Sequence, residues 1–173
     1  MMERLTVKGL AARLERLESE QAIRACMHRY MVLCDDLGEA TPMDELAGLF
    51  AEDAVWEGVG DRYRATFGVL QGRRAIRAML ARYTVAPAHF RLNAHFLAGE
   101  CIRLTGQDEG VGHWMMLQTS TFASGASHLT SARLTVDFRR RDGVWRMSHF
   151  RTENLFARPV AAWNAEEALP VPR

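Results

Sequence analysis

The sequence predicts an α+β domain in which N-terminal helices pack on a curved, mostly antiparallel sheet. Helix-type spacing of apolar residues is confined to the first half of the chain, and four long strand-like stretches fill the second half. The connections between these stretches are short, which favours antiparallel neighbours. Because long antiparallel strands must curl to bury one face against helices, we expect a curved sheet with the helices on its buried face.

Three helices and one short strand are expected before the long strands. In the first helix, apolar side chains recur at steps of three and four, and Gly38 ends the pattern. Thr41 is a suitable N-cap for the second helix, with Pro42 at its first helical position, and Pro87 follows the third. The helices are expected at residues 8–36, 43–50 and 73–84, the strand at 54–59, and a loop at 60–70.

The second half of the chain has the pattern of a meander. Its strands are expected at about residues 89–104, 109–123, 127–140 and 144–157, with turns at 106–108, 124–126 and 142–143. The last turn, Asp142-Gly143, has a composition typical of a tight hairpin. Residues 158–173 contain three prolines and are expected to be irregular. We expect one domain over residues 1–173, with its core at about 12–157.

The composition argues against several classes of partner. The chain of 173 residues has 22 basic and 21 acidic side chains, and a net charge of +1 provides no bulk field for nucleic acid or an anionic membrane. Three consecutive arginines, 139–141, precede the Asp-Gly turn and are expected to decorate it. No apolar run approaches the roughly 20 residues of a membrane helix. The charged N-terminus is unlike a signal peptide, and three cysteines without CxxC spacing favour a reducing compartment. We therefore expect a cytoplasmic protein.

The sequence contains no familiar cofactor motif. It has no HExxH, no pair of histidines at metal-ligand spacing, and no GxGxxG, P-loop or GxSxG pattern. We therefore expect no metal ion and no organic cofactor.

Asp35 and His95 are a candidate acid–base pair. Asp35 ends the first helix one turn after Met31 on the apolar stripe, so its carboxylate can face inward while Asp36 faces out. His95 lies in the first long strand, where two alternatives stay open. If the side chains simply alternate, the face that carries Phe96 is buried and His95, on the other face, is in water. A partly polar concave face, or a bulge, would instead place His95 in the pocket.

Four stretches of sequence resemble the SnoaL-like branch of the NTF2-like superfamily. They are LERLESEQAIRACMHRYMVLCDD, DELAGLFAEDAVWEG, LNAHFLAGE and RRRDGVWRMSHF. The resemblance covers roughly residues 12–157 and is strongest to the scytalone dehydratases, bile-acid dehydratases and hexachlorocyclohexane dehydrochlorinases. It implies the NTF2-like α+β cone, in which a curved sheet and three helices enclose a pocket. Many members are cofactor-free lyases, isomerases or cyclases, and others are binding or structural subunits.

The resemblance also implies three catalytic positions. The family aspartate falls on Asp35, the family histidine on His95, and the tyrosine of several dehydratases on Tyr30. An ideal helix separates Tyr30 from Asp35 by about 140°. Tyr30 on an apolar stripe is also compatible with a core role, so both alternatives stay open.

Four further residues are candidates for a substrate-binding wall. Gln118 stands where the bile-acid enzymes have a second carboxylate, and a histidine of the scytalone enzymes falls near His113 or Trp114. Trp114 and Gln118 share one strand parity, and His113 points the other way. Gln118 is equally compatible with a satisfied polar residue of the core. Trp56 either lines the cavity or belongs to the ordinary core.

Two functions are therefore expected from the sequence. The first is a cofactor-free lyase or isomerase, dehydratase-like or cyclase-like, in which the Asp35–His95 pair removes a proton from a small hydrophobic ring compound. The alternative is a non-catalytic ligand-binding or oligomer-forming protein, because one fold serves many functions. A homodimer or homotrimer is expected in either case, because a broad sheet face is available for a second copy.

Overall fold

The computed structural model describes residues 6–161 and 163. The elements of this part of the chain are α1 (Val7–Asp35), α2 (Met43–Gly48), β1 (Phe50–Val59), α3 (Gly60–Phe67), β2 (Val69–Gln71), α4 (Arg73–Ala81), β3 (Phe90–Leu104), β4 (Glu109–Phe122), β5 (Ser127–Arg141) and β6 (Val144–Val160). Of these described helices, none is long and apolar enough to cross a membrane.

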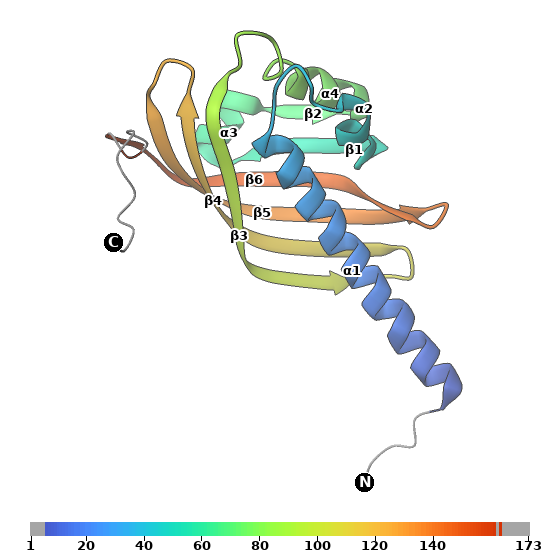
Figure 1. Cartoon of the computed structure of the whole chain (residues 1–173). Coiled ribbons are helices and arrows are strands. Elements are labelled where there is room, and N and C mark those ends of the chain that lie inside the picture. The colour runs from blue at the N-terminus through green and yellow to red at the C-terminus, as the bar shows by residue number, and fades with distance from the viewer. Residues whose placement is uncertain (1–5, 162, 164–173) are drawn as a thin grey trace, which may run out of the picture.

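The described strands form one open sheet in the order β2-β1-β6-β5-β4-β3. All neighbouring strands are antiparallel except β1 and β6, which run parallel. The long strands curl around α1, which crosses one face of the sheet, while α2, α3 and α4 cluster near β1 and β2 (Figure 1). The predicted α+β cone is confirmed, and the parallel pair makes its sheet mixed.

The core lies between α1 and the concave face of the sheet. The C-terminal half of α1 buries Ile23, Met27, Tyr30 and Met31. The N-terminal half of the same helix extends beyond the sheet (Figure 1), and its leucines are at least half exposed. As a result, only the second half of α1 helps to form the enclosed space described below.

Residues 60–70, expected to be a loop, are instead α3 and β2. The helix folds back against β1, where Tyr63 and Phe67 lie one turn apart and contact each other edge to face. Gly58 permits this close return, because a Cβ there would lie 2.4 Å from the Tyr63 carbonyl oxygen. Two polar arginines and a threonine in the segment mask this aromatic spacing in the sequence.

The boundaries of the other elements differ by a few residues. β1 begins at Phe50 rather than at 54, and α4 ends at Ala81 rather than at 84. β6 continues to Val160, into the segment predicted to be irregular, because it stays paired with β5 down to Ser127. The rest of that segment, apart from residues 161 and 163, lies outside the described residues.

The predicted Asp-Gly hairpin between β5 and β6 is confirmed. Both of its turn residues have positive φ, 53° for Asp142 and 74° for Gly143. Positive φ at two successive positions is characteristic of a type I′ turn, whose twist matches that of the flanking strands.

Candidate active site

Asp35 and His95 meet where the end of α1 crosses β3. Asp35 Oδ1 lies 2.6 Å from His95 Nδ1 and accepts a second hydrogen bond, of 2.9 Å, from the His95 backbone N–H. The side chains are 27% and 10% exposed. A single carboxylate oxygen therefore fixes both the backbone and the ring of the histidine, although the residues are 60 positions apart.

The paired Nδ1 determines what the other ring nitrogen can do. A carboxylate accepts hydrogen bonds, so Nδ1 carries the proton and Nε2 carries a free lone pair in the neutral ring. Nε2 has no hydrogen-bond partner within the described residues. This arrangement is the one that a general base requires.

The polar parity of β3 faces the inside of the cone. Asn93 and His95 point inward, while Leu92 and Phe96 lie on the outer face, 45% and 56% exposed. An irregularity in the register with β4, between Phe90 and Leu92, brings Phe90 to the inner side as well. The alternative in which plain alternation leaves His95 in water is wrong, because this concave face is a partly polar wall.

His95 borders two adjoining cavities inside the cone, of about 120 and 260 Å³. The residues common to both are Tyr30, Cys34, Trp56, Tyr63, Phe67, His95 and Gln118. They come from α1, β1, α3, β3 and β4, so segments from most of the chain converge on the imidazole. Aromatic and aliphatic side chains dominate the lining, as in typical small-molecule sites.

Tyr30 lies in the wall of this cavity and is also part of its aromatic packing. Its ring contacts Phe50 and Phe150, with centroids 5.5 and 5.2 Å away. Burial raises the pKa of the Tyr30 hydroxyl well above its usual value, and the nearby Trp56 indole opposes that shift. Tyr30 therefore stays protonated at neutral pH and can act as a hydrogen-bond donor.

Trp56 contributes both a flat apolar surface and an unused donor. Its ring stacks on Phe150 at 5.7 Å and meets Phe67 edge to face. Its Nε1 is buried and has no hydrogen bond of proper geometry in the described part of the chain, although Tyr30 is close enough to affect it. A buried donor without a partner is costly, so a ligand acceptor in this cavity would relieve that cost.

Gln118 belongs to a polar network beside the dyad. Its side-chain amide donates to Asn93 Oδ1 at 2.8 Å, and Ser120 donates to the same oxygen at 2.7 Å. Asn93 in turn donates to the Cys34 carbonyl at the end of α1, at 2.9 Å. The network ties β3, β4 and α1 together and fixes the strand that bears His95.

His113 and Trp114 are not among the residues that line either cone cavity. His113 is exposed on the outer face and pairs with Thr135 at 3.2 Å. Trp114 is 1% exposed in the core, where it packs against Phe138 and donates to Glu100. The structure therefore separates these two candidates from Asp35, His95, Tyr30, Trp56 and Gln118, which it brings together.

Some lining residues went unrecognised in the sequence. Asn93 shares the strand parity of His95, and Ser120 that of Gln118, so parity was the available signal. Tyr63 lies in the segment expected to be a loop, which hid its helical spacing with Phe67. Within residues 6–161 and 163, no group of three or more His, Cys, Asp or Glu side chains is placed to hold a metal ion.

Fold and site together define a class: a small α+β cone with an acid–imidazole pair at its inner wall. Residues 15–151 match the family model of the SnoaL-like domain. The chain therefore belongs to the SnoaL-like family, as the sequence motifs predict. No functionally curated protein matches the sequence.

Solved structures of similar shape include two hexachlorocyclohexane dehydrochlorinases. LinA type 2 is 23% identical with a TM-score of 0.72, over 91% of this chain and 98% of that one. LinA type 3 from Novosphingobium barchaimii LL02 is 22% identical with a TM-score of 0.71, over 92% and 99%. A protein provisionally named a scytalone dehydratase, from Novosphingobium aromaticivorans DSM 12444, is 19% identical with a TM-score of 0.70, over 92% and 97%. These likenesses establish the NTF2-like fold.

Proposed function

We propose that this protein is a cofactor-free lyase or isomerase that acts on a small hydrophobic ring compound. The observation that carries the proposal is the Asp35–His95 pair: His95 lines an apolar cavity, and its Nε2 has no hydrogen-bond partner within the described residues. In this proposal His95 Nε2 takes a proton from a carbon made acidic by a neighbouring electron-withdrawing group.

Asp35 acts on the reaction through His95. It holds the proton on Nδ1, so Nε2 is free to accept a second proton, and its negative charge stabilises the imidazolium that forms. The electron pair left on carbon either expels a leaving group from the adjacent carbon or shifts a double bond. In the second case the imidazolium returns its proton to another carbon, and the reaction is an isomerisation.

Tyr30 serves in this proposal as a donor to the developing negative charge. Its hydroxyl stays protonated because burial raises its pKa. A neutral donor in a water-poor cavity stabilises an enolate oxygen or a departing group more strongly than the same donor in water. Trp56 Nε1, which is buried beside Tyr30 and has no hydrogen bond of proper geometry among the described residues, supplies a second donor nearby.

The cavity supports a ring compound as the substrate class. An apolar cavity of about 150 Å³ accommodates benzene, and the larger cone cavity measures about 260 Å³. Aromatic faces of Trp56, Tyr63 and Phe67 offer flat contacts for a ring. Solved relatives are named for hexachlorocyclohexane and for scytalone. Halogenated cyclohexanes and hydroxylated hydroaromatic ketones are therefore the first compounds to test.

The non-catalytic alternative receives less support from the geometry. That role predicts a cone filled by large side chains and an Asp35 carboxylate in open solvent. Instead, the cone contains two cavities, and Asp35 contacts His95 twice.

The test is a panel of such ring compounds incubated with the wild-type protein in D₂O. NMR detects loss of the acidic C–H, and mass spectrometry detects the eliminated or rearranged product. We expect at least one compound to exchange or react faster with the protein than without it. His95→Gln is expected to abolish the acceleration, and His149→Gln, at an imidazole outside the cone, to preserve it. The proposal fails if no compound responds, or if Asp35→Asn and His95→Gln both retain wild-type rates.

A further inference from the structure

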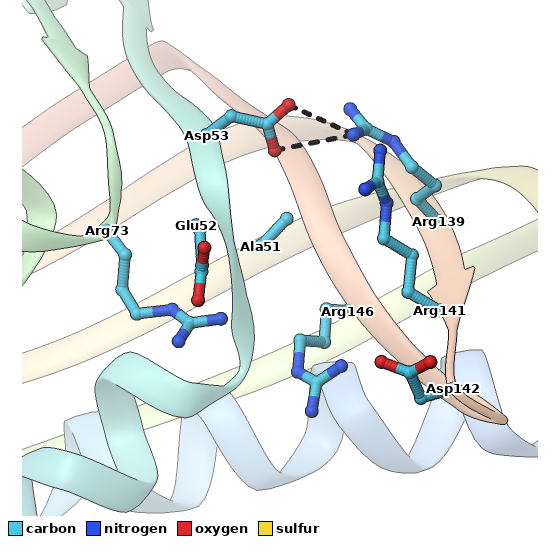
Figure 2. A pocket seen from close by; sticks show the side chains of 8 residues that line it. All are labelled: Ala51, Glu52, Asp53, Arg73, Arg139, Arg141, Asp142 and Arg146. Carbon is cyan, nitrogen blue, oxygen red and sulfur yellow. Dashed lines mark hydrogen bonds and ion pairs between the residues drawn. The ribbon is translucent and has the colours of Figure 1, made fainter.

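A cavity of about 520 Å³ lies apart from the two cavities that His95 borders. It is lined by Ala51, Glu52, Asp53, Arg73, Arg139, Arg141, Asp142 and Arg146 (Figure 2), none of which lines the cone cavities. The four arginines come from the start of α4, the end of β5 and the start of β6. Four guanidinium groups around one cavity stand out in a chain of net charge +1.

The cavity lies on the face of the sheet opposite α1. Arg140 points toward α1, where it pairs with Glu15 at 3.2 Å and lies over the buried Trp145 ring. Side chains alternate along a strand, so Arg139 and Arg141 point to the other face. Arg146 stands opposite Arg139 in the sheet and shares that direction. The site is therefore separate from the proposed active site.

An irregularity in β1 accounts for the hollow. The pairing of β1 with β6 shifts register between Phe50 and Val55. Next to this gap, Arg73 Nε donates to the Phe50 carbonyl at 2.8 Å, and Arg146 Nε donates to the Gly48 carbonyl at 3.2 Å. Among the described residues, both arginines form hydrogen bonds through Nε only, which leaves their terminal N–H groups available for a ligand.

The remaining two arginines differ in their pairing. Arg139 uses one terminal nitrogen to bind both oxygens of Asp53, at 3.0 and 3.3 Å, and lowers the pKa of that carboxyl. Arg141 has no hydrogen bond or ion pair with any described residue. Of the three carboxylates in the lining, Asp53 is therefore already neutralised, whereas Glu52 has no such partner among the described residues.

We propose that this cavity binds a small molecule that carries both a phosphate and hydroxyl groups. Arg73, Arg141 and Arg146 hold the phosphate. The carboxylates of Glu52 and Asp142 accept hydrogen bonds from the hydroxyl groups. A phosphate is tetrahedral and accepts hydrogen bonds from several directions. A carboxylate is planar, and a single arginine in the same plane can occupy both of its oxygens. Figure 2 shows the Arg141 guanidinium beside Arg139; because the Arg141 side chain is exposed and unpaired among the described residues, it is free to turn toward a phosphate held by Arg73 and Arg146. The two carboxylates would repel a bare anion but accept hydrogen bonds from ligand hydroxyls.

The test is isothermal titration calorimetry of the full chain with glucose 6-phosphate, inorganic phosphate, sulfate and glucose. We expect glucose 6-phosphate to bind most tightly, the two inorganic anions more weakly, and glucose not at all. Arg141→Gln breaks no hydrogen bond or ion pair among the described residues. It is expected to weaken binding roughly tenfold or more, the loss typical of one charge-assisted hydrogen bond. Arg141→Glu is expected to abolish binding.

The matched control is Arg133→Gln, which removes an arginine of the outer face that pairs with Glu153 at 2.7 Å and does not line this cavity. The Arg133→Gln protein is expected to bind glucose 6-phosphate with the affinity of the wild type. The proposal is overturned if glucose 6-phosphate does not bind at millimolar concentration, or if the substitutions at 141 and 133 weaken binding equally. Glucose 6-phosphate that binds no better than sulfate would also overturn it, because the site would then select charge alone.

Discussion

Among the described residues, the sheet carries two histidine–carboxylate pairs, one on each face. Inside the cone, Asp35 binds Nδ1 of His95 at 2.6 Å. On the outer face, Glu57 binds Nε2 of His149 at 2.9 Å, and Arg151 approaches the remaining ring nitrogen at 3.5 Å. The carboxylates are similarly exposed, 27% for Asp35 and 28% for Glu57, whereas the imidazoles are 10% and 29% exposed.

The two pairs differ at the second ring nitrogen, which must be free if the imidazole is to accept a proton from a substrate. His149 has neighbours at both ring nitrogens and lines neither cone cavity, so it has no lone pair directed at a substrate. His95 has one nitrogen fixed and the other free beside an apolar cavity. The outer pair therefore provides an internal control for every test of the inner one.

The largest expected effect is that of His95→Gln. Because it removes the proposed base, turnover of a ring substrate should fall by about 10²–10⁴-fold, the range for general base catalysis. The measurement is kcat/KM by product mass spectrometry. His149→Gln should stay within about twofold of the wild type, since that ring is remote from the cavity. Equal losses in both variants would remove the distinction between the pairs.

Asp35→Asn is expected to cause the second largest loss of turnover. Asparagine can donate to Nδ1, which would move the imidazole proton to Nε2 and block the base. The loss in kcat should reach about 10²-fold or more, as carboxylate removal does in other acid–histidine pairs. Glu57→Gln is the matched change on the outer face and should leave kcat unaltered. An active Asp35→Asn protein would mean that the carboxylate does not set the tautomer.

Tyr30→Phe is expected to have a smaller effect. It removes one hydrogen bond to developing charge and keeps the ring that packs on Phe50 and Phe150. The kcat should fall roughly ten- to a hundredfold with little change in KM. The melting temperature serves as the control, because a fall in kcat with a large loss of stability would indicate a packing role instead.

The last prediction concerns stability rather than activity, and it compares the buried thiols with the exposed one. Burial raises the pKa of Cys26 and of Cys34 to about 12. The unfolded chain loses these protons near pH 9 while the folded chain keeps them, so unfolding releases protons and stability falls as pH rises from about 9 to 12. The slope is up to about 1.4 kcal/mol per pH unit for each thiol.

Urea denaturation at several alkaline pH values measures this slope. Cys34→Ala should flatten it, and Cys101→Ala, at an exposed thiol, should not. At neutral pH an alkylating reagent should modify Cys101 and spare the two buried thiols. Rapid labelling of all three in the folded protein would contradict the burial of the other two.

Local patterns predicted most of the fold. Helical periodicity placed α1 within one residue at each end, and turn residues placed the long strands within one residue at their starts. The prediction of a loop at residues 60–70 was wrong because α3 is defined by its packing on β1. The polar residues between Tyr63 and Phe67 conceal that contact in the sequence. The predicted end of β6 was wrong for a similar reason, since that strand is prolonged by its pairing with β5 rather than by its own composition.

The candidate site depended on information that is not local. The resemblance to the SnoaL-like family singled out Asp35 and His95, and the structure then brought them together from two elements. Strand alternation alone pointed His95 the wrong way, because the concave wall of this cone is partly polar. The arginine-lined cavity was not foreseen, since the sequence alone associates Arg139 and Arg141 with a turn and gives no reason to join them to Arg73.

The most direct test of the central claim is the protonation of the imidazoles at neutral pH, by long-range ¹H–¹⁵N NMR with His95→Gln and His149→Gln for assignment. The account predicts that His95 carries its proton on Nδ1, with a bare Nε2. It also predicts that Asp35→Asn moves this proton, whereas Glu57→Gln does not affect His95. A proton on Nε2 of His95 in the wild-type protein would contradict the account, because that nitrogen would then have no lone pair with which to accept a proton.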